Sequence, residues 1–165
     1  MSSTRLPVVK AFLVCDQVIQ DVQTGKKSLI GVFHEIKAGR FPTVHHELWI
    51  YANLTDAQGR YEFQIRLVSL EDGKALGHGA PPEIQIPGPL QTTELSAQLR
   101  NVQLPKPGTY EFQLLANGQL AATKAVRVSH AQPPDAPDPL QEGADDLEDA
   151  LDPEEPDDPD EPNLF

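Results

Sequence analysis

The chain has 165 residues, enough for one domain of ordinary size, and 39% of them are hydrophobic. Its acidity is uneven: residues 133–165 hold 14 of the 25 Asp and Glu, 8 of the 16 prolines and no Lys or Arg. The preceding part keeps 11 acidic against 13 basic residues. A nearly neutral body lacks the clustered cations that neutralise phosphates, so we expect no nucleic-acid partner.

Targeting signals are missing from the sequence. The first residues are followed by no apolar run typical of a secretory signal, and no stretch approaches the 18 or so apolar residues of a membrane helix. Cys15 is the one cysteine, which excludes an intramolecular disulfide. These features predict a cytoplasmic protein that has no membrane partner.

The first half of the chain has the pattern of β-strands. Segments 8–22 and 27–36 are rich in Val, Ile and Phe and flank a turn at Gly25, which predicts a hairpin. Residues 47–54 predict the next strand. Segment 60–70 alternates between apolar and polar residues. Its apolar face is formed by Tyr61, Phe63, Ile65 and Leu67.

The second half continues the β pattern after a loop-like stretch at 77–90, which contains a short predicted strand at 83–86. Three longer strands are predicted, at 93–104, 109–115 and 119–128. The first of these changes parity at Asn101, which indicates a β-bulge or a bend. Asn117 and Gly118 separate the last two, and this pair is typical of a type I′ hairpin turn.

About eight short strands and no helical periodicity predict an all-β fold, a single antiparallel β-sandwich over residues 8–128. The segment 107–112, PGTYEF, resembles the tyrosine corner of immunoglobulin-like and fibronectin-like sandwiches. That resemblance implies a hydrogen bond from Tyr110 to upstream backbone and a core position for Phe112. It also implies that Trp49, on the third strand, is buried.

The acidic, proline-rich segment 131–165 has too few apolar groups to offset the conformational entropy that ordering would cost, so it is predicted to be disordered. Its tip ends in Leu164 and Phe165, which resembles the C-terminal tip of bacterial single-stranded-DNA-binding proteins. Those tips dock on partner proteins. The tail therefore predicts either capture of another protein through Leu164 and Phe165 or a solubilising role.

No catalytic signature is present: there is no nucleophile elbow, phosphate loop, dinucleotide fingerprint or zinc-protease motif. Cys15 lies in an apolar strand and is expected to pack as a small hydrophobe. His45 and His46 are adjacent on a strand, so they point to opposite faces and make a poor metal pair. Asp56 and Asp72 are expected to be turn residues. We therefore predict no enzyme activity, no metal and no cofactor.

Trp49 and Tyr51 are the candidate binding surface on the body. They share one face of their strand, whereas Leu48 and Ile50 share the other, so both faces are apolar. Packing of the aromatic pair in the core is the favoured interpretation. The alternative is a carbohydrate-binding or peptide-binding site, and a convergent catalytic site involving His45 or His46 remains open.

Five segments are similar to an uncharacterised bacterial domain family. They are Cys15-Asp16-Gln17-Val18-Ile19, Gly25-Lys26, the strand 29–33, Phe41-Pro42 and the segment 107–112. The resemblance covers residues 8–128 and implies one compact domain from a bacterium, without an assigned activity. Together with the absent catalytic signature, it leads to the hypothesis of a non-enzymatic protein-interaction module.

Overall fold

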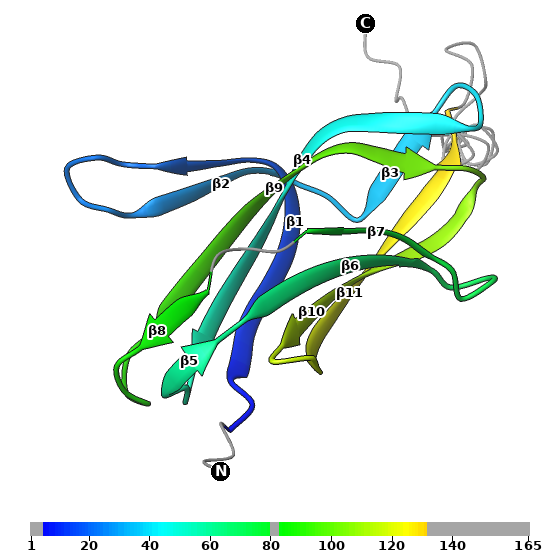
Figure 1. The fold of residues 1–165 in the computed structure, drawn as a ribbon. Coiled ribbons are helices and arrows are strands. Elements are labelled where there is room, and N and C mark those ends of the chain that lie inside the picture. Colours follow the sequence, from blue (N-terminus) through cyan, green and yellow to red (C-terminus); the bar gives the residue numbers. More distant parts are fainter. Residues whose placement is uncertain (1–4, 80–82, 132–165) are drawn as a thin grey trace, which may run out of the picture. The chain divides into compact units, whose positions relative to one another are not determined.

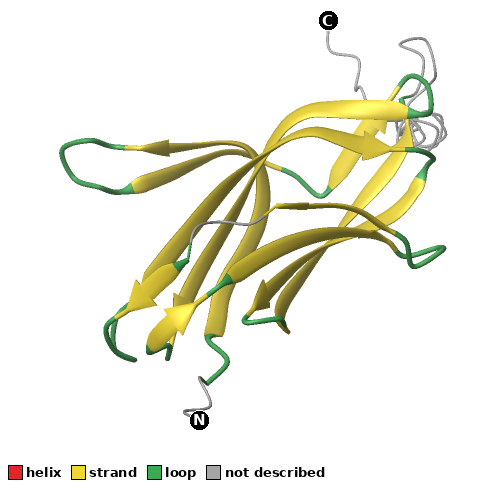
Figure 2. Cartoon of the chain, viewed as in Figure 1, coloured by secondary structure: helices red, strands yellow, loops and turns green. Residues whose placement is uncertain are grey.

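The computed structural model describes residues 5–79 and 83–131. All regular structure in these two ranges is β-strand, as Figure 2 shows. The strands are β1 (Val8–Gln20), β2 (Lys27–Val32), β3 (Glu35–Ala38), β4 (Thr43–Thr55), β5 (Gly59–Tyr61), β6 (Phe63–Ser69), β7 (Ala75–Gly79), β8 (Ile84–Ile86), β9 (Thr93–Leu104), β10 (Gly108–Ala116) and β11 (Gln119–His130). The predicted all-β class is confirmed. Nowhere in the described ranges is there a helix long and apolar enough to cross a membrane.

The strands form three sheets. A four-stranded sheet has the order β2-β1-β4-β9, a five-stranded sheet has the order β3-β11-β10-β6-β7, and β5 pairs with β8. The neighbouring strands run antiparallel, with the exception of the parallel pair β3 and β11. Figure 1 shows β4 and β9 in one layer and β6, β10 and β11 in another.

One hydrophobic core joins the two larger sheets, because alternate residues of strands in both sheets point into it. The predicted apolar face of segment 60–70 is confirmed: Tyr61, Phe63, Ile65 and Leu67 are all buried. From the four-stranded sheet, Leu48 and Ile50 belong to the same core. Burying each such side chain contributes about 1.5–3 kcal/mol, so this shared core is the main source of stability.

The segment 107–112 forms the predicted tyrosine corner. The Tyr110 hydroxyl donates a hydrogen bond to the carbonyl oxygen of Lys106 at 2.6 Å, and both Tyr110 and Phe112 are buried. Lys106 also forms ion pairs with Glu71 at 2.9 Å and with Asp72 at 3.5 Å, which ties the corner to the turn after β6. The predicted type I′ turn is present as well, since Asn117 and Gly118 both have positive φ.

The prediction of a single strand over 27–36 is wrong. The segment is divided into β2, which pairs with β1, and β3, which crosses to the other sheet and pairs in parallel with β11. At this crossing the Ser129 hydroxyl donates a hydrogen bond to the Glu35 carboxylate at 2.7 Å, and this bond lowers the pKa of Glu35. A parallel pair between distant segments leaves no local signal in the sequence, so the pattern of 27–36 could not reveal it.

Other strand boundaries also differ from the prediction. β4 begins at Thr43, four residues before the predicted start, and β7 begins at Ala75 and extends into the stretch 77–90 predicted as loop. The strand predicted at 60–70 is divided, because β5 pairs with β8 whereas β6 belongs to the five-stranded sheet. The parity change at Asn101 is a bend rather than a bulge, because the pairing of β4 with β9 keeps one register on both sides of it. Asn101 adopts a left-handed φ of 53° opposite His46, which turns both strands together.

The β1–β2 hairpin bends away from the first half of β1, as Figure 1 shows. At the bend Gly31 has a φ of 63°, and a Cβ placed there would lie 2.1 Å from a carboxylate oxygen of Asp16. The turn at the tip is held by Asp21, whose carboxylate accepts hydrogen bonds at 2.8 Å from the backbone N–H groups of Gln23 and Thr24. These bonds lower the pKa of Asp21. The hairpin is therefore an ordered projection.

Candidate interaction surfaces

The aromatic pair predicted from the sequence lies on the outer face of the four-stranded sheet. Leu48 and Ile50 take the core positions of β4, so Trp49 and Tyr51 point to the opposite side. Trp49 is half-buried and Tyr51 is 9% exposed. The expectation that Trp49 packs in the core is therefore wrong: the two faces of β4 are both apolar, and alternation alone does not say which one meets the second sheet.

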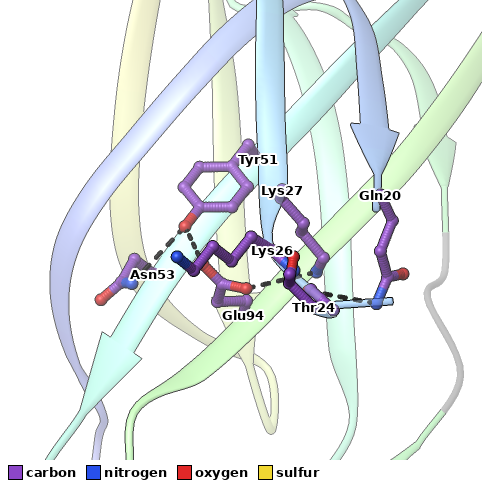
Figure 3. Close-up of polar contacts among 8 residues, drawn as sticks. Gln20, Thr24, Lys26, Lys27, Tyr51, Asn53 and Glu94 are labelled. Carbon is purple, nitrogen blue, oxygen red and sulfur yellow. Dashed lines mark hydrogen bonds and ion pairs between the residues drawn. The ribbon is translucent and has the colours of Figure 1, made fainter. Parts of the chain in front are cut away.

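Tyr51 is held by polar partners on its own strand and on the neighbouring β9 (Figure 3). Its hydroxyl donates a 2.5 Å hydrogen bond to the Glu94 carboxylate and lies 3.5 Å from the Asn53 amide nitrogen. Burial, followed by the bond to Glu94, raises the pKa of Tyr51. Lys27, at the start of β2, approaches the same carboxylate at 3.9 Å and is itself 13% exposed. The hairpin therefore reaches over the outer face of the sheet near Tyr51.

Trp49 is likewise held by a polar partner. Its indole N–H donates to the Glu47 carboxylate at 3.3 Å, and Glu47 also forms an ion pair with Arg100 at 3.8 Å. Hydrogen bonds from Gln98 and from Trp49 lower the pKa of Glu47. A sugar-stacking site needs an open aromatic face. With Tyr51 buried and Trp49 half-buried in this network, the aromatic pair forms a poor platform of that kind.

The remaining candidates for a catalytic or metal-binding role lie in environments typical of residues that only stabilise the fold. Cys15 is buried, its thiol donates weakly to the carbonyl oxygens of Gln17 and Trp49, and burial raises its pKa, which keeps the thiol protonated. His45 is half-buried with its ring 5.9 Å from that of Phe33, whereas His46 is exposed. Within the described ranges, no three His, Cys, Asp or Glu side chains gather as a metal site would require. The tail candidates Leu164 and Phe165 lie outside those ranges.

A surface that the sequence reasoning missed lies on the β1–β2 hairpin. Ile19, Ile30 and Val32 are 44%, 46% and 53% exposed, and Val22 in the turn is 98% exposed. Val18 and Leu29, on the face opposite Ile19 and Ile30, are half-buried. The sequence contained a signal for this surface, since Leu29 and Ile30 make both faces of β2 apolar although the strand belongs to a short hairpin.

Hollows elsewhere in the described part are shallow or narrow. A hollow of about 480 Å³ lies between β3 and the start of β4, and it is lined by Lys37, Arg40 and His45 among others. A narrower groove of about 280 Å³ runs between β7 and β9, with Phe112 at its floor. Neither brings together a nucleophile, a base and a charge-stabilising group.

The comparisons with known proteins give fold-level likeness at low identity. The alkylpurine DNA glycosylase AlkC of Pseudomonas fluorescens, solved with DNA that contains an abasic site analogue, superposes with a TM-score of 0.51 at 10% identity over 76% of this chain. The chain spans 31% of the length of that protein. This likeness concerns the fold alone.

Two further solved structures have TM-scores too low to bear on the fold. The sensor domain of the anti-sigma factor RsgI4 of Pseudobacteroides cellulosolvens has a TM-score of 0.37 at 12% identity, covering 62% of this chain and 93% of that one. An immunoglobulin-like protein of Pseudomonas aeruginosa has a TM-score of 0.36 at 11% identity, covering 77% and 99%. No curated protein matches the chain. A family model does match over residues 10–129, most of the length, and the chain belongs to this family of unknown function, DUF6941.

Proposed function

We propose that the chain is a non-enzymatic protein-interaction module whose binding element is the β1–β2 hairpin. The observation that carries the proposal is the clustering of exposed apolar side chains. Of the ten large hydrophobic residues exposed in the described ranges, four belong to this one hairpin, namely Ile19, Val22, Ile30 and Val32. Exposed apolar side chains scattered singly need no explanation, whereas a contiguous group on an ordered projection is typical of a protein-binding surface.

The scaffold in this proposal is an immunoglobulin-like β-sandwich over residues 8–128. The tyrosine corner at Tyr110, the core position of Phe112 and the core shared by the two larger sheets support this classification. Parallel pairing of β3 with β11 is a departure from a purely antiparallel sandwich. A rigid two-sheet body presents the hairpin in a fixed geometry, which reduces the entropy lost on binding.

The proposed setting is the bacterial cytoplasm, where a buried, protonated Cys15 stays reduced. The acidic segment 131–165 would then either solubilise the molecule or contribute a second contact through Leu164 and Phe165. Its net negative charge also disfavours non-specific binding to nucleic acid.

The test compares protein capture from the lysate of the source cell. The bait proteins are the full chain, the variant Ile30→Lys, and the control variant Leu120→Lys, which places the same charge at an equally exposed apolar position on β11. We expect Ile30→Lys to lose the captured protein and Leu120→Lys to retain it. Equal capture by all three would contradict the proposal.

A chain shortened to end at Gln132 distinguishes binding by the hairpin from binding by the tail. If the hairpin is the binding element, this shortened chain retains the partner. Loss of the partner on shortening, with Ile30→Lys unaffected, would assign recognition to the tail instead, and Phe165→Ala would then show whether the tip carries it.

A further inference from the structure

We infer that the open edge of β3 binds an extended acidic segment of another protein, which joins the five-stranded sheet as a further strand. This inference goes beyond the proposed function, because the β3 edge is a surface separate from the exposed apolar residues of the hairpin. Three features carry it: unpaired backbone groups, free space beside them, and two cations that line this space.

The backbone of β3 is paired on one side. β3 ends the five-stranded sheet, and β11 is its partner in the part of the chain that the structure describes. The carbonyl oxygens of His34 and Ala38 accept hydrogen bonds at 2.9 Å from N–H groups in and just after β11. Backbone groups of successive residues point to opposite edges of a strand, so those of Glu35 and Lys37 point to the open edge. An added strand would pair with them.

Two hollows lie along this edge. One, of about 480 Å³, lies between β3 and the start of β4, and the other, of about 360 Å³, extends toward Gly31. The two hollows adjoin, because Ile36, Lys37 and His45 line both of them. The facing part of β4 is also uncovered by β1, since β4 pairs with β1 only from Trp49 onward. The open edge of β3 therefore borders space in which a further strand can lie.

The larger hollow is cationic. Lys37 and Arg40 line it, whereas no Asp or Glu is among its lining residues. Both cations are exposed, and neither forms an ion pair with another residue of the described ranges. After the hydrogen bond from Ser129, positive charges led by that of Lys37 lower the pKa of Glu35 further. Acidic groups on a ligand would complement this charge.

These features select the chemistry of the occupant. A row of unpaired N–H and C=O groups matches the backbone of an extended polypeptide, which a sugar or a lipid does not reproduce. Alternate side chains of an added strand would lie on the side of Ile36, which packs against the core, and these are expected to be apolar. The others would lie on the side of Lys37. Acids are expected at the Arg40 end, because Asp16 and Glu35 line the smaller hollow at the other end.

A segment of another protein matches the edge better than the acidic segment of this chain. Residues 133–165 include 8 prolines, which lack the N–H groups that strand pairing requires. The longest stretch without proline is 140–152, so a synthetic peptide of these residues tests the alternative. If it binds the full chain more tightly than the probe peptides described next, the edge belongs to this chain's own segment and the choice of partner is wrong.

Fluorescence anisotropy of labelled peptides with the full chain tests the inference. The probes alternate valine and threonine and end in two glutamates, at the amino end in one peptide and at the carboxyl end in the other, so that both strand directions are sampled. We expect one of them to bind, more weakly as salt is added. Lysines in place of the glutamates should weaken binding about tenfold. No binding of either glutamate peptide at about 1 mM, or equal binding of the lysine peptides, would overturn the inference.

Charge variants locate the site on the molecule. Lys37→Gln and Arg40→Gln each remove one cation from the larger hollow and should weaken binding of the glutamate peptide about threefold. Arg66→Gln is the matched control, because it removes the same charge from an exposed position on β6. It should bind like the natural chain. Equal weakening in all three variants would show a general attraction between charges and overturn the assignment to β3.

Backbone methylation of the glutamate peptide tests strand pairing by itself. An added edge strand turns only alternate N–H groups toward β3. Methylation of one alternate set of amides should therefore abolish binding, whereas methylation of the other set should preserve it. The side chains and charges are the same in both forms. Equal and undiminished binding of the two methylated peptides would exclude strand addition.

The outcomes separate this inference from the proposed function. Ile30→Ala changes the hairpin surface and leaves the β3 edge intact, so its affinity for the peptide should equal that of the natural chain. If Ile30→Lys loses a protein captured from lysate and no peptide binds, the proposed function holds and the β3 inference is wrong. If the peptide binds in an Arg40-dependent way and Ile30→Lys captures as the natural chain does, the β3 inference holds and the proposed function fails.

Discussion

The core strands and the β1–β2 hairpin are built from the same residue types and have opposite surroundings. In β6 and β10, Ile65 and Phe112 are almost completely buried between the two larger sheets. In the hairpin, Ile30 and Val32 leave about half of each side chain in solvent. Both regions are β-strands that carry large apolar side chains. The difference arises from whether a second sheet lies over the apolar face.

The bend at Gly31 produces this difference. It directs the hairpin away from the core, so the hairpin gains some cover on its inner face from the sheet that it came from, and none on its outer face from the five-stranded sheet. The core supplies stability, whereas the hairpin exposes apolar side chains that this core does not cover. The proposed binding function is therefore assigned to the hairpin, and the stability function to the core.

The largest effect is expected in the core. Phe112→Ala removes a buried ring and leaves a cavity, which should lower the free energy of unfolding by about 3–5 kcal/mol. Ile30→Ala, at the half-exposed hairpin position, should cost less than about 1 kcal/mol. Urea denaturation followed by circular dichroism measures both. Similar losses for the two variants would mean that the hairpin is part of the cooperative core.

The next effect tests the tyrosine corner. Tyr110→Phe leaves the partly buried carbonyl oxygen of Lys106 without its hydrogen-bond donor, which should cost about 1–3 kcal/mol. Tyr110 is buried and its ring stays in place, so the change isolates the hydroxyl group. Urea denaturation of Tyr110→Phe gives the value. A loss below about 0.5 kcal/mol would show that the corner does not stabilise the fold.

The sequence predicts the core better than the hairpin, for reasons visible in particular residues. Tyr61 to Leu67 alternate with one apolar face, which leaves a single way to bury them. Asn117-Gly118 and Tyr110 carry local signals whose geometry is set within a few residues. β4 is apolar on both faces, so the outward direction of Trp49 depends on distant strands, as does the crossing of β3 to the other sheet.

The candidate site was only partly accessible to sequence reasoning. Trp49 and Tyr51 stood out as aromatic residues, and the structure shows them engaged by Glu47 and Glu94. The exposure of Ile30 follows from the bend at Gly31, and a glycine beside an apolar residue is compatible with many backbone conformations. Nothing in the local pattern shows that the bend removes the facing sheet.

A smaller effect is expected at the bend itself. Gly31→Ala forces a non-glycine residue into a left-handed conformation and pushes its Cβ against Asp16, which should cost about 1–2 kcal/mol. Gly25→Ala is the matched control, because Gly25 has a φ of 69° with open space around it. The excess loss in Gly31→Ala over Gly25→Ala measures the contact with Asp16. Equal losses in urea denaturation would mean that Asp16 moves aside without cost.

The smallest effect concerns pH. Because burial raises the pKa of Tyr51 above its ordinary value of 10.0, its contribution to stability is complete below about pH 10 and is lost as the pH rises through the folded-state pKa. The natural chain should therefore lose stability above about pH 10 more steeply than Tyr51→Phe. Urea denaturation of both proteins between about pH 8 and pH 11 measures the difference. Parallel curves would contradict the assignment.

Hydrogen exchange of the full chain, measured by mass spectrometry, tests the division between scaffold and binding surface most directly. The amides of β10 should be protected, because they open only through global unfolding. Those of Lys27–Val32 should exchange much faster, because β2 pairs with β1 alone in the described ranges. Exchange in β2 as slow as in β10 would contradict this division.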